Sequence, residues 1–263
     1  MQRLTQARVR AALAGLKAGP FSANVHVFER VGSTNDVARQ MAEDQAPEGT
    51  LILAEEQTAG RGRMGRTWYA PPGTSLLMSV VFRPAFAPEQ AHRLVMACGL
   101  AVAEACEGLL DVAVGVKWPN DLVLGGRKVG GILLENAITG DALLWAVVGM
   151  GVNVNQTFEG HSALSETATS LKLATGRECD RLALLRAIVA GLHHWHSRLH
   201  GSGLVEEWRR RCVTLGQRVR VGGMGGMIIG WAEDIDDNGA LLLRDEAGRR
   251  HAIFSGEATL LTE

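Results

Sequence analysis

Runs of apolar residues alternate with polar stretches along the chain, and the spacing within each run predicts an element. β-Branched residues and alternation predict strands at 25–29, 50–56, 74–83, 112–118, 128–138 and 143–154. Apolar residues spaced three and four apart predict helices at 34–44, 88–109 and 180–199, with a short amphipathic helix at 3–16. Most consecutive strands are joined by short connections rather than by helices. This order favours an α+β fold, in which helices pack on one side of a mixed β-sheet, over a doubly wound parallel sheet.

The composition changes after residue 211, where short strands, glycine turns and the hairpin sequence Asp237-Asn238-Gly239 follow. We expect a leader helix over 1–20, a main domain over 21–211 and a small C-terminal β-barrel over 212–263. The N-terminal segment is too short for the three helices of a usual DNA-reading helix-turn-helix domain. The glycine-rich stretch at 222–226 would add flexibility to the small domain, and we have no physical account of it.

Composition and charge narrow the function classes. The 263 residues are 46% hydrophobic, and 27 basic against 28 acidic residues give a net charge of −1. No overall field would therefore hold nucleic acid or an anionic membrane. The four cysteines, at 98, 106, 179 and 212, have no C-x-x-C spacing and are expected to be buried thiols in a reducing compartment. Without a membrane-spanning run or a signal peptide, we expect a cytoplasmic protein.

The loop TAGRGRMGRTWYAPPGTS at 58–75 fits three descriptions. Gly60, Gly62 and Gly65 match a dinucleotide fingerprint, and 60–67 differs from a P-loop only by an arginine in place of lysine. Both motifs require a helix directly after the glycines. The following residues, WYAPPG at 68–73, cannot form one, because two prolines and a glycine interrupt it.

The third description is a flexible basic loop that carries Arg61, Arg63 and Arg66 and ends in Trp68. Such a loop could close over an anionic ligand that contains a ring, with guanidinium groups on phosphate or carboxylate. Taken alone, the same loop is also consistent with an ordinary solvated surface segment.

A second segment, GVKWPNDLVLGGRKVGGILLE at 115–135, places Lys117 at a strand end and a Pro-Asn-Asp turn after it. Lys128 then enters a strand that contains Gly130-Gly131. Paired glycines inside an apolar strand mark a bulge or a place where a ligand lies against the backbone, which suggests the floor of a pocket. Ordinary turn chemistry and exposed strand-end charges explain the same residues if each is taken singly.

Several motifs follow one another in a fixed order: Ser33-Thr34-Asn35, Gln57 before AGRGRMGRTW, KWPND at 117–121, RKVGGILLE at 127–135, VVGMGVNVN at 147–155 and GEATLL at 256–261. In this order they resemble the biotin–protein ligases, and the resemblance extends over residues 21–263. It implies a mixed-sheet catalytic domain followed by an SH3-like barrel. It also implies that ATP and Mg²⁺ activate biotin to biotinyl-5'-AMP.

The resemblance further implies a partner. A lysine of a biotin carboxyl carrier domain, from acetyl-CoA carboxylase or a related carboxylase, would attack the acyl carbon of the adenylate. A homodimer is plausible for the family. Its bifunctional members carry an N-terminal winged helix that binds operator DNA, for which this chain has no room, so we expect neither DNA binding nor membrane association.

Carried over by position, the resemblance implies a role for each motif residue. The expected biotin-binding residues are Ser33, Thr34, Asn35, Gln57, Arg61, Gly62, Arg63, Lys128, Gly131, Leu133, Gly149 and Gly151. The expected ATP-binding residues are Arg63, Arg66, Trp68, Asn120, Asp121, Lys128 and Asn153. Lys128, Arg63 and Asp121 would be catalytic, with Asp121 either binding Mg²⁺ or orienting the attacking amine. Ser33 would also cap a helix, with Asp36 as its capping-box partner.

Two other functions are weighed against this one. A lipoate–protein ligase would use the same fold, but its R-R-x-x-G-G-G loop and His-Asp pair are missing. A non-catalytic anion-binding module would keep the loop arginines and bind with steep salt dependence. In addition, HHWHSRLH at 193–200 places His193, His196 and His200 on one helix face, where packing histidines are favoured over a metal site because no cysteine or carboxylate joins them.

Overall fold

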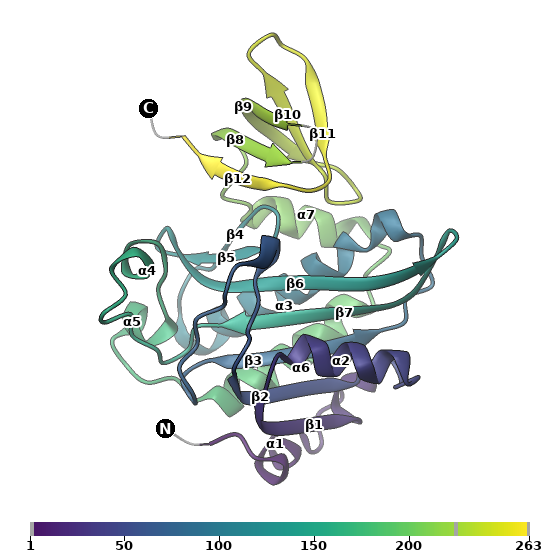
Figure 1. The fold of residues 1–263 in the computed structure, drawn as a ribbon, viewed down its shortest axis with the longest axis vertical. Coiled ribbons are helices and arrows are strands. Elements are labelled where there is room, and N and C mark those ends of the chain that lie inside the picture. The colour runs from purple at the N-terminus through teal and green to yellow at the C-terminus, as the bar shows by residue number, and fades with distance from the viewer. Residues whose placement is uncertain (1–2, 224–225, 262–263) are drawn as a thin grey trace.

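A computed structural model describes residues 3–223 and 226–261 of the chain. A seven-stranded mixed sheet forms its centre, in the order β1-β2-β3-β7-β6-β5-β4 (Figure 1). Its strands are β1 (Val25–Val31), β2 (Leu51–Gln57), β3 (Leu76–Phe82), β4 (Gly115–Lys117), β5 (Asp121–Leu124), β6 (Arg127–Thr139) and β7 (Ala142–Val152). Only the β1–β2 pair is parallel. The predicted α+β class with a mixed sheet is confirmed.

Helices cover both faces of this sheet. They are α1 (Gln6–Leu13), α2 (Thr34–Glu43), α3 (His92–Leu110), α4 (Ser162–Thr167), α5 (Leu171–Thr175), α6 (Arg181–His196) and α7 (Ser202–Arg211), with short 3₁₀ turns at Gly19–Ser22, Arg63–Gly65 and Pro88–Gln90. The expectation of helices on one side only is wrong, because α2 lies on the face opposite α3 and α6 (Figure 1). Ala38 and Ala42 of α2 pack there against Ile52, Val81 and Val147.

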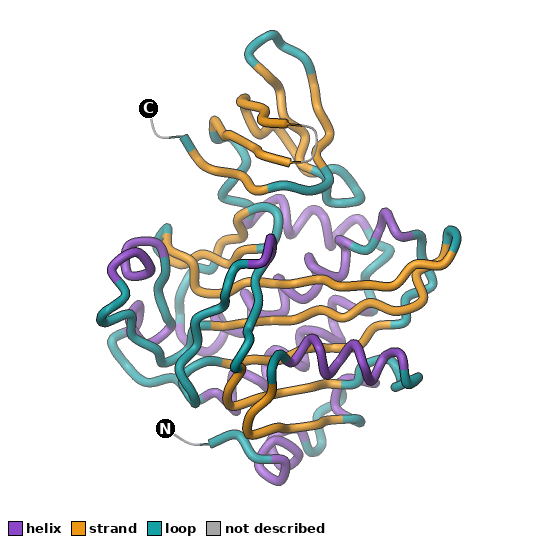
Figure 2. The backbone as a smooth tube through the Cα atoms, in the orientation of Figure 1, coloured by secondary structure: helices purple, strands orange, loops and turns teal. Residues whose placement is uncertain are grey.

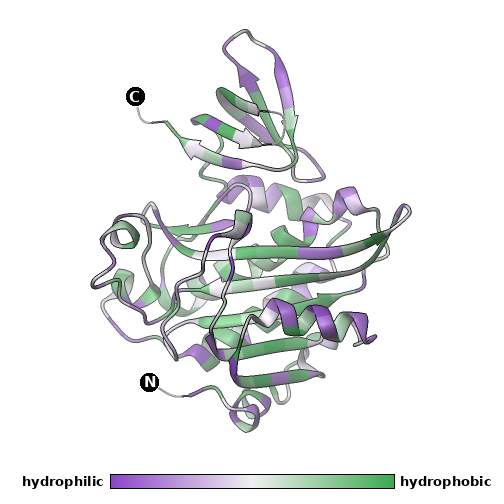
Figure 3. Ribbon diagram, viewed as in Figure 1, coloured by the Kyte–Doolittle hydropathy of each residue, from purple (hydrophilic) through white to green (hydrophobic). Residues whose placement is uncertain are grey.

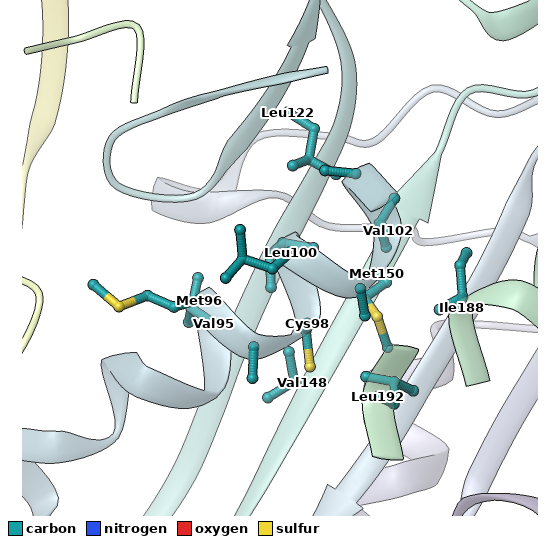
Figure 4. Close-up of a cluster of buried hydrophobic side chains, with 14 of the residues drawn as sticks. Val95, Met96, Cys98, Leu100, Val102, Leu122, Val148, Met150, Ile188 and Leu192 are labelled. Atoms are coloured by element: carbon teal, nitrogen blue, oxygen red, sulfur yellow. The ribbon is translucent and has the colours of Figure 1, made fainter. Parts of the chain in front are cut away.

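The main core lies between the sheet, α3 and α6. Cys98 of α3 lies near Val148 and Met150 of β7, and Ile188 and Leu192 of α6 lie on the other side of Met150 (Figure 4). All four cysteines are buried and free, as expected. Burial raises the pKa of Cys106 to about 12, because the thiolate loses its hydration there. These thiols belong to the core.

The C-terminal sheet is antiparallel, in the order β11-β10-β9-β8-β12. Its strands are β8 (Arg218–Gly223), β9 (Gly226–Ile235), β10 (Leu241–Asp245), β11 (Arg250–Ile253) and β12 (Glu257–Leu260). The hairpin expected at 237–239 joins β9 to β10, and Gly239 takes a φ of +89° in it. Among the described strands no pairing joins β11 to β12, so the closed ring of a barrel is not present in these pairings. Residues 224 and 225 of the glycine-rich stretch lie outside the described part.

The small sheet lies beside α7 (Figure 2), and side-chain hydrogen bonds join it to the rest of the chain. Trp118 is 1% exposed, and its Nε1 donates to the carbonyl of Gly239 at 3.0 Å. Arg93 and Arg209 donate to the carbonyls of Asp237 and Ile235. Hydrophobic residues concentrate in the central strands and polar residues on the outer helix faces, while the small sheet carries both kinds (Figure 3). Among the described helices, none has the length and apolarity needed to cross a membrane.

Candidate active site

A cavity of about 430 Å³ lies between the glycine loop, the start of α2, the β5–β6 hairpin and β7. Every residue assigned to biotin or ATP from the sequence lines it. Those residues come from segments far apart in the chain, and the crossover from β3 to β7 brings them together. Juxtaposition of this kind is the first requirement of a site that joins two substrates.

The glycine loop folds back on itself above the cavity. Gly62 N donates to Arg66 O at 2.6 Å, and Trp68 N donates to Gly60 O at 2.9 Å. Between them, Met64 and Gly65 take φ values of 56° and 72°. No helix follows the glycines, so neither nucleotide-binding motif has the structure that it needs.

Arg61 anchors this loop to the protein. Its guanidinium binds Asp36 through two bonds of 2.7 and 2.8 Å and reaches Glu135 at 3.3 Å. The hydrogen bond from Arg61 lowers the pKa of Asp36 below its ordinary value. The Asp36 carboxylate is therefore turned to Arg61, and its expected role as capping-box partner is wrong. Ser33 does cap α2, since its Oγ accepts from Asn35 N at 3.3 Å.

Lys128 and Asp121 form an ion pair across the β5–β6 hairpin. Lys128 Nζ lies 2.5 Å from Asp121 Oδ1, and both side chains are about one-third exposed or less, at 32% and 26%. The same ammonium lies 5.5 Å from the centre of the Trp68 ring, within the range of a cation–π contact. A bulge between Leu122 and Val123 turns the hairpin at this point.

The remaining cations of the cavity differ in their partners. Arg63 donates to Asn120 Oδ1 at 3.3 Å, and burial lowers the pKa of its guanidinium. Arg66 binds Glu257 of the small sheet at 2.8 Å. Lys117 also lines the cavity, and within the described part of the chain its ammonium has neither an ion pair nor a hydrogen bond. Sequence reasoning treated Lys117 only as a strand-end charge.

A buried polar network closes the far end of the cavity. Thr34 donates to Gln57 Oε1 from its backbone N at 2.7 Å and from its hydroxyl at 2.8 Å. Ser79 Oγ lies 2.7 Å from Asn35 Oδ1, and Asn35 Nδ2 donates to Glu135 at 3.0 Å. Ser79 and Glu135 were not singled out from the sequence. Both lie in strands, where a lone polar residue gives no local motif.

Close contacts explain the glycines in the cavity floor. A Cβ on Gly151 would lie 2.7 Å from the Trp68 indole, and one on Gly131 would lie 3.2 Å from it. A Cβ on Gly149 would lie 2.2 Å from Asn35 Oδ1. The indole therefore rests directly on the glycine floor, and its Nε1 is buried with no hydrogen-bond partner among the described residues.

Asn153 links the strands to the following loop. Its Nδ2 donates to Thr169 O at 2.9 Å, and its Oδ1 accepts from Gln156 at 2.9 Å. Away from the cavity, His196 binds Glu48 at 2.8 Å and lies against Phe21, as a packing histidine would. Among the described residues, no cluster of three or more histidine, cysteine or acidic side chains could hold a metal ion.

Comparisons with known proteins show which families this chain is similar to. The model of the biotin/lipoate A/B protein ligase family matches residues 27–153, and that of the biotin protein ligase C-terminal domain matches residues 214–261. A biotin–[acetyl-CoA-carboxylase] ligase from Mycobacterium tuberculosis is 37% identical over 89% of this chain and 88% of its own length. The bifunctional ligase/repressor BirA of Bacillus subtilis is 32% identical over 94% of this chain and 77% of its own length.

Solved structures are similar as well. The biotin protein ligase from Aquifex aeolicus in complex with biotin and ATP has a TM-score of 0.76 at 29% identity, covering 92% of this chain and 100% of that one. The Leishmania major biotin protein ligase in complex with biotinyl-5-AMP has a TM-score of 0.60 at 26% identity, covering 88% of this chain and 98% of that one.

Proposed function

The chain belongs to the biotin protein ligase family, and we propose that its cavity carries out both steps of biotin attachment. In the first step, the biotin carboxylate attacks the α-phosphate of ATP, forming biotinyl-5'-AMP and releasing pyrophosphate. In the second, the amine of a carrier-domain lysine attacks the acyl carbon and AMP leaves. The carrier domain belongs to a biotin-dependent carboxylase. The observation that carries this proposal is the convergence of Arg63, Lys128 and Asp121 in one cavity.

The chemistry needs positioning and positive charge rather than a protein nucleophile. Biotin and ATP are both anions, so the main barrier is to bring them together and to stabilise charge that develops on the phosphate oxygens. Lys128 is the candidate for the carboxylate and the α-phosphate. Arg63 is the candidate for the neighbouring phosphate oxygens, because its guanidinium is held at the cavity wall by Asn120.

Lys128 and Asp121 bind each other in the structure, and each would change its partner when the substrates bind. When the two anions enter, the Lys128 ammonium turns to them and the Asp121 carboxylate is released. Mg²⁺ in nucleotide enzymes is commonly held by one or two carboxylates together with substrate phosphates, so Asp121 fits as the ligand from this chain. When bound, the metal would add positive charge beside the phosphates. Asp121 is equally placed to accept a hydrogen bond from the attacking lysine amine.

Lys117 is assigned to the polyphosphate of ATP. The other cations that line the cavity each have an acceptor on the protein, whereas the Lys117 ammonium has none among the described residues. A cation that has no partner on the protein can bind the negatively charged ATP without first breaking an ion pair. We therefore place the leaving pyrophosphate near Lys117.

The biotin ring is assigned to the polar network at the other end. Its urea group offers N–H donors and an acceptor carbonyl. Gln57 Nε2 has no acceptor in the described part of the chain, while the Gln57 and Thr34 oxygens are fixed by each other. The glycine floor at Gly131 and Gly151 would lie beneath the tail, and Trp68 would close over it.

Biotin-dependent exchange of labelled pyrophosphate into ATP tests the first step. The protein should catalyse exchange with biotin and not with lipoate, which is the substrate of the related acyl-adenylating class. Exchange with lipoate alone would move the chain to that class. Absence of exchange with either acid, combined with salt-sensitive binding of an anionic partner, would support the non-catalytic module.

A further inference from the structure

The outward face of the C-terminal sheet carries an unusual row of apolar side chains. Met227, Ile229 and Trp231 follow one another at alternate positions of β9 and are 65%, 37% and 50% exposed. Alternate residues of a strand share one face, and Ala232, on the other face, is 1% exposed. A sheet that meets only water normally presents polar residues outward. An aligned row of this kind marks a contact surface.

Arginines border this row on both sides. In the strand register, Arg220 of β8 lies opposite Ile229, and Trp231 lies between Arg218 and Arg244. Arg218 and Arg244 form ion pairs with Glu246 and Glu233. Arg220 is exposed and has no acidic partner among the described residues. We call Arg218, Arg220, Met227, Ile229, Trp231 and Arg244 the outer face.

The outer face continues to the mouth of the cavity. β12 pairs with β8 so that Thr259 lies opposite Arg220 and Glu257 opposite Gly222. Glu257 therefore points to the same side as Arg220, and it lines the cavity while binding Arg66 at 2.8 Å. In Figure 1, β12 and β8 are the strands of the small sheet nearest the main sheet. A molecule on the outer face lies beside the active site.

We propose that the outer face docks the carrier domain whose lysine receives biotin, with acidic residues of that domain meeting Arg220. This inference rests on the proposed function. The acceptor lysine belongs to a folded domain, so the body of that domain must rest on surface that borders the cavity. Tryptophan, methionine and arginine are among the residues enriched at such contacts. A second copy of this chain fits less well, because a twofold contact would turn the same basic face on itself.

Steady-state transfer to a purified carrier domain tests the docking, with pyrophosphate exchange as the second readout. Trp231→Glu and Arg220→Glu should each raise the KM for the carrier about tenfold, while biotin-dependent exchange stays within twofold of the unaltered protein. The matched control is Leu144→Glu, because Leu144 is also 50% exposed but lies on β7 of the main sheet. It should leave both readouts unchanged.

The outcomes separate this inference from the proposed function. An unaltered protein that shows no biotin-dependent exchange refutes the function itself. Normal exchange with an unchanged carrier KM in both variants overturns the docking, as does an equal rise in Leu144→Glu. Sedimentation of the same proteins tests whether a second copy of this chain binds the outer face instead. If Trp231→Glu abolishes a dimer and leaves the carrier kinetics normal, the outer face is a self-association surface and the proposal is overturned.

Discussion

The Lys128 ammonium lies 2.5 Å from the Asp121 carboxylate and 5.5 Å from the centre of the Trp68 ring. These three residues stand on β6, at the start of β5 and in the glycine loop, so their meeting depends on the fold rather than on any local motif. Under the proposed function, this cation would lie where the two anionic substrates react. In the structure, Asp121 neutralises it.

Removing this cation should slow adenylation. We predict that Lys128→Ala lowers the single-turnover rate of pyrophosphate release by roughly 10²-fold or more, because a positioned charge on the reacting phosphate is lost. Lys128→Arg should recover only part of the rate, since a planar guanidinium does not replace an ammonium at a tight site. Near-normal adenylation by Lys128→Ala would show that the assignment is wrong.

Lys117, the second lysine of the cavity, should affect the binding of ATP and not that of biotin. Lys117→Met is expected to raise the KM for ATP about tenfold and to leave the KM for biotin within twofold, because the triphosphate loses its cationic partner. Lys172→Met is the control, since Lys172 pairs with Glu178 outside the cavity. Equal changes for biotin and ATP would argue against a phosphate role.

The glycine floor offers a steric test. Gly151→Ala should displace the Trp68 indole, since its Cβ would lie 2.7 Å from that ring, and should lower the free energy of unfolding by about 1–3 kcal/mol together with activity. Gly108→Ala lies in α3 with nothing within 4 Å of its Cβ and should stabilise the protein by about 0.5–1 kcal/mol. Urea unfolding of both variants decides the matter. A silent Gly151→Ala would mean that the indole is not held against the floor.

A buried histidine predicts a pH dependence of stability. Burial, with the nearby charge of Arg63, lowers the pKa of His92 from 6.5 to about 4. The unfolded chain therefore binds a proton between these values while the folded protein does not, so stability should fall as pH drops from 6.5 toward 4. This shift corresponds to roughly 3 kcal/mol when complete.

His92→Phe keeps the ring contact with Trp208 and removes the titrating group. Between pH 7 and pH 5, the free energy of unfolding of this variant should therefore decrease by less than that of the unaltered protein, as measured by urea titration at each pH. Equal losses in the two proteins would contradict the assignment.

Much of the fold follows from sequence patterns, and the misses have physical causes. Strand β5 was not predicted, because it is short and begins at Asp121, which is also the last residue of the Pro-Asn-Asp turn. Helices α4 and α5, with six and five residues, are too short to show a helical apolar spacing, and the ten-residue α7 was also not expected. The side of α2 could have been inferred, since LLMSVVF at 76–82 is apolar except for Ser79, and such a run is typical of a strand covered on both faces.

The site shows a similar division. The motif residues could be named from the sequence, and the structure brings all of them to one cavity. Their partners could not be named, because Ser79 and Glu135 contact Asn35 only through strand pairing and helix packing at long sequence separation. The sequence also does not show which motif cations have an acidic partner on the protein, because those partners are distant in the chain.

The central claim is tested most directly by the mass of a carrier domain after incubation with this protein, ATP, Mg²⁺ and biotin. Transfer predicts a gain of one biotinyl group, mapped to a single lysine and dependent on both biotin and ATP. A carrier of unchanged mass, in a reaction where an established biotin ligase modifies the same carrier, would contradict the claim.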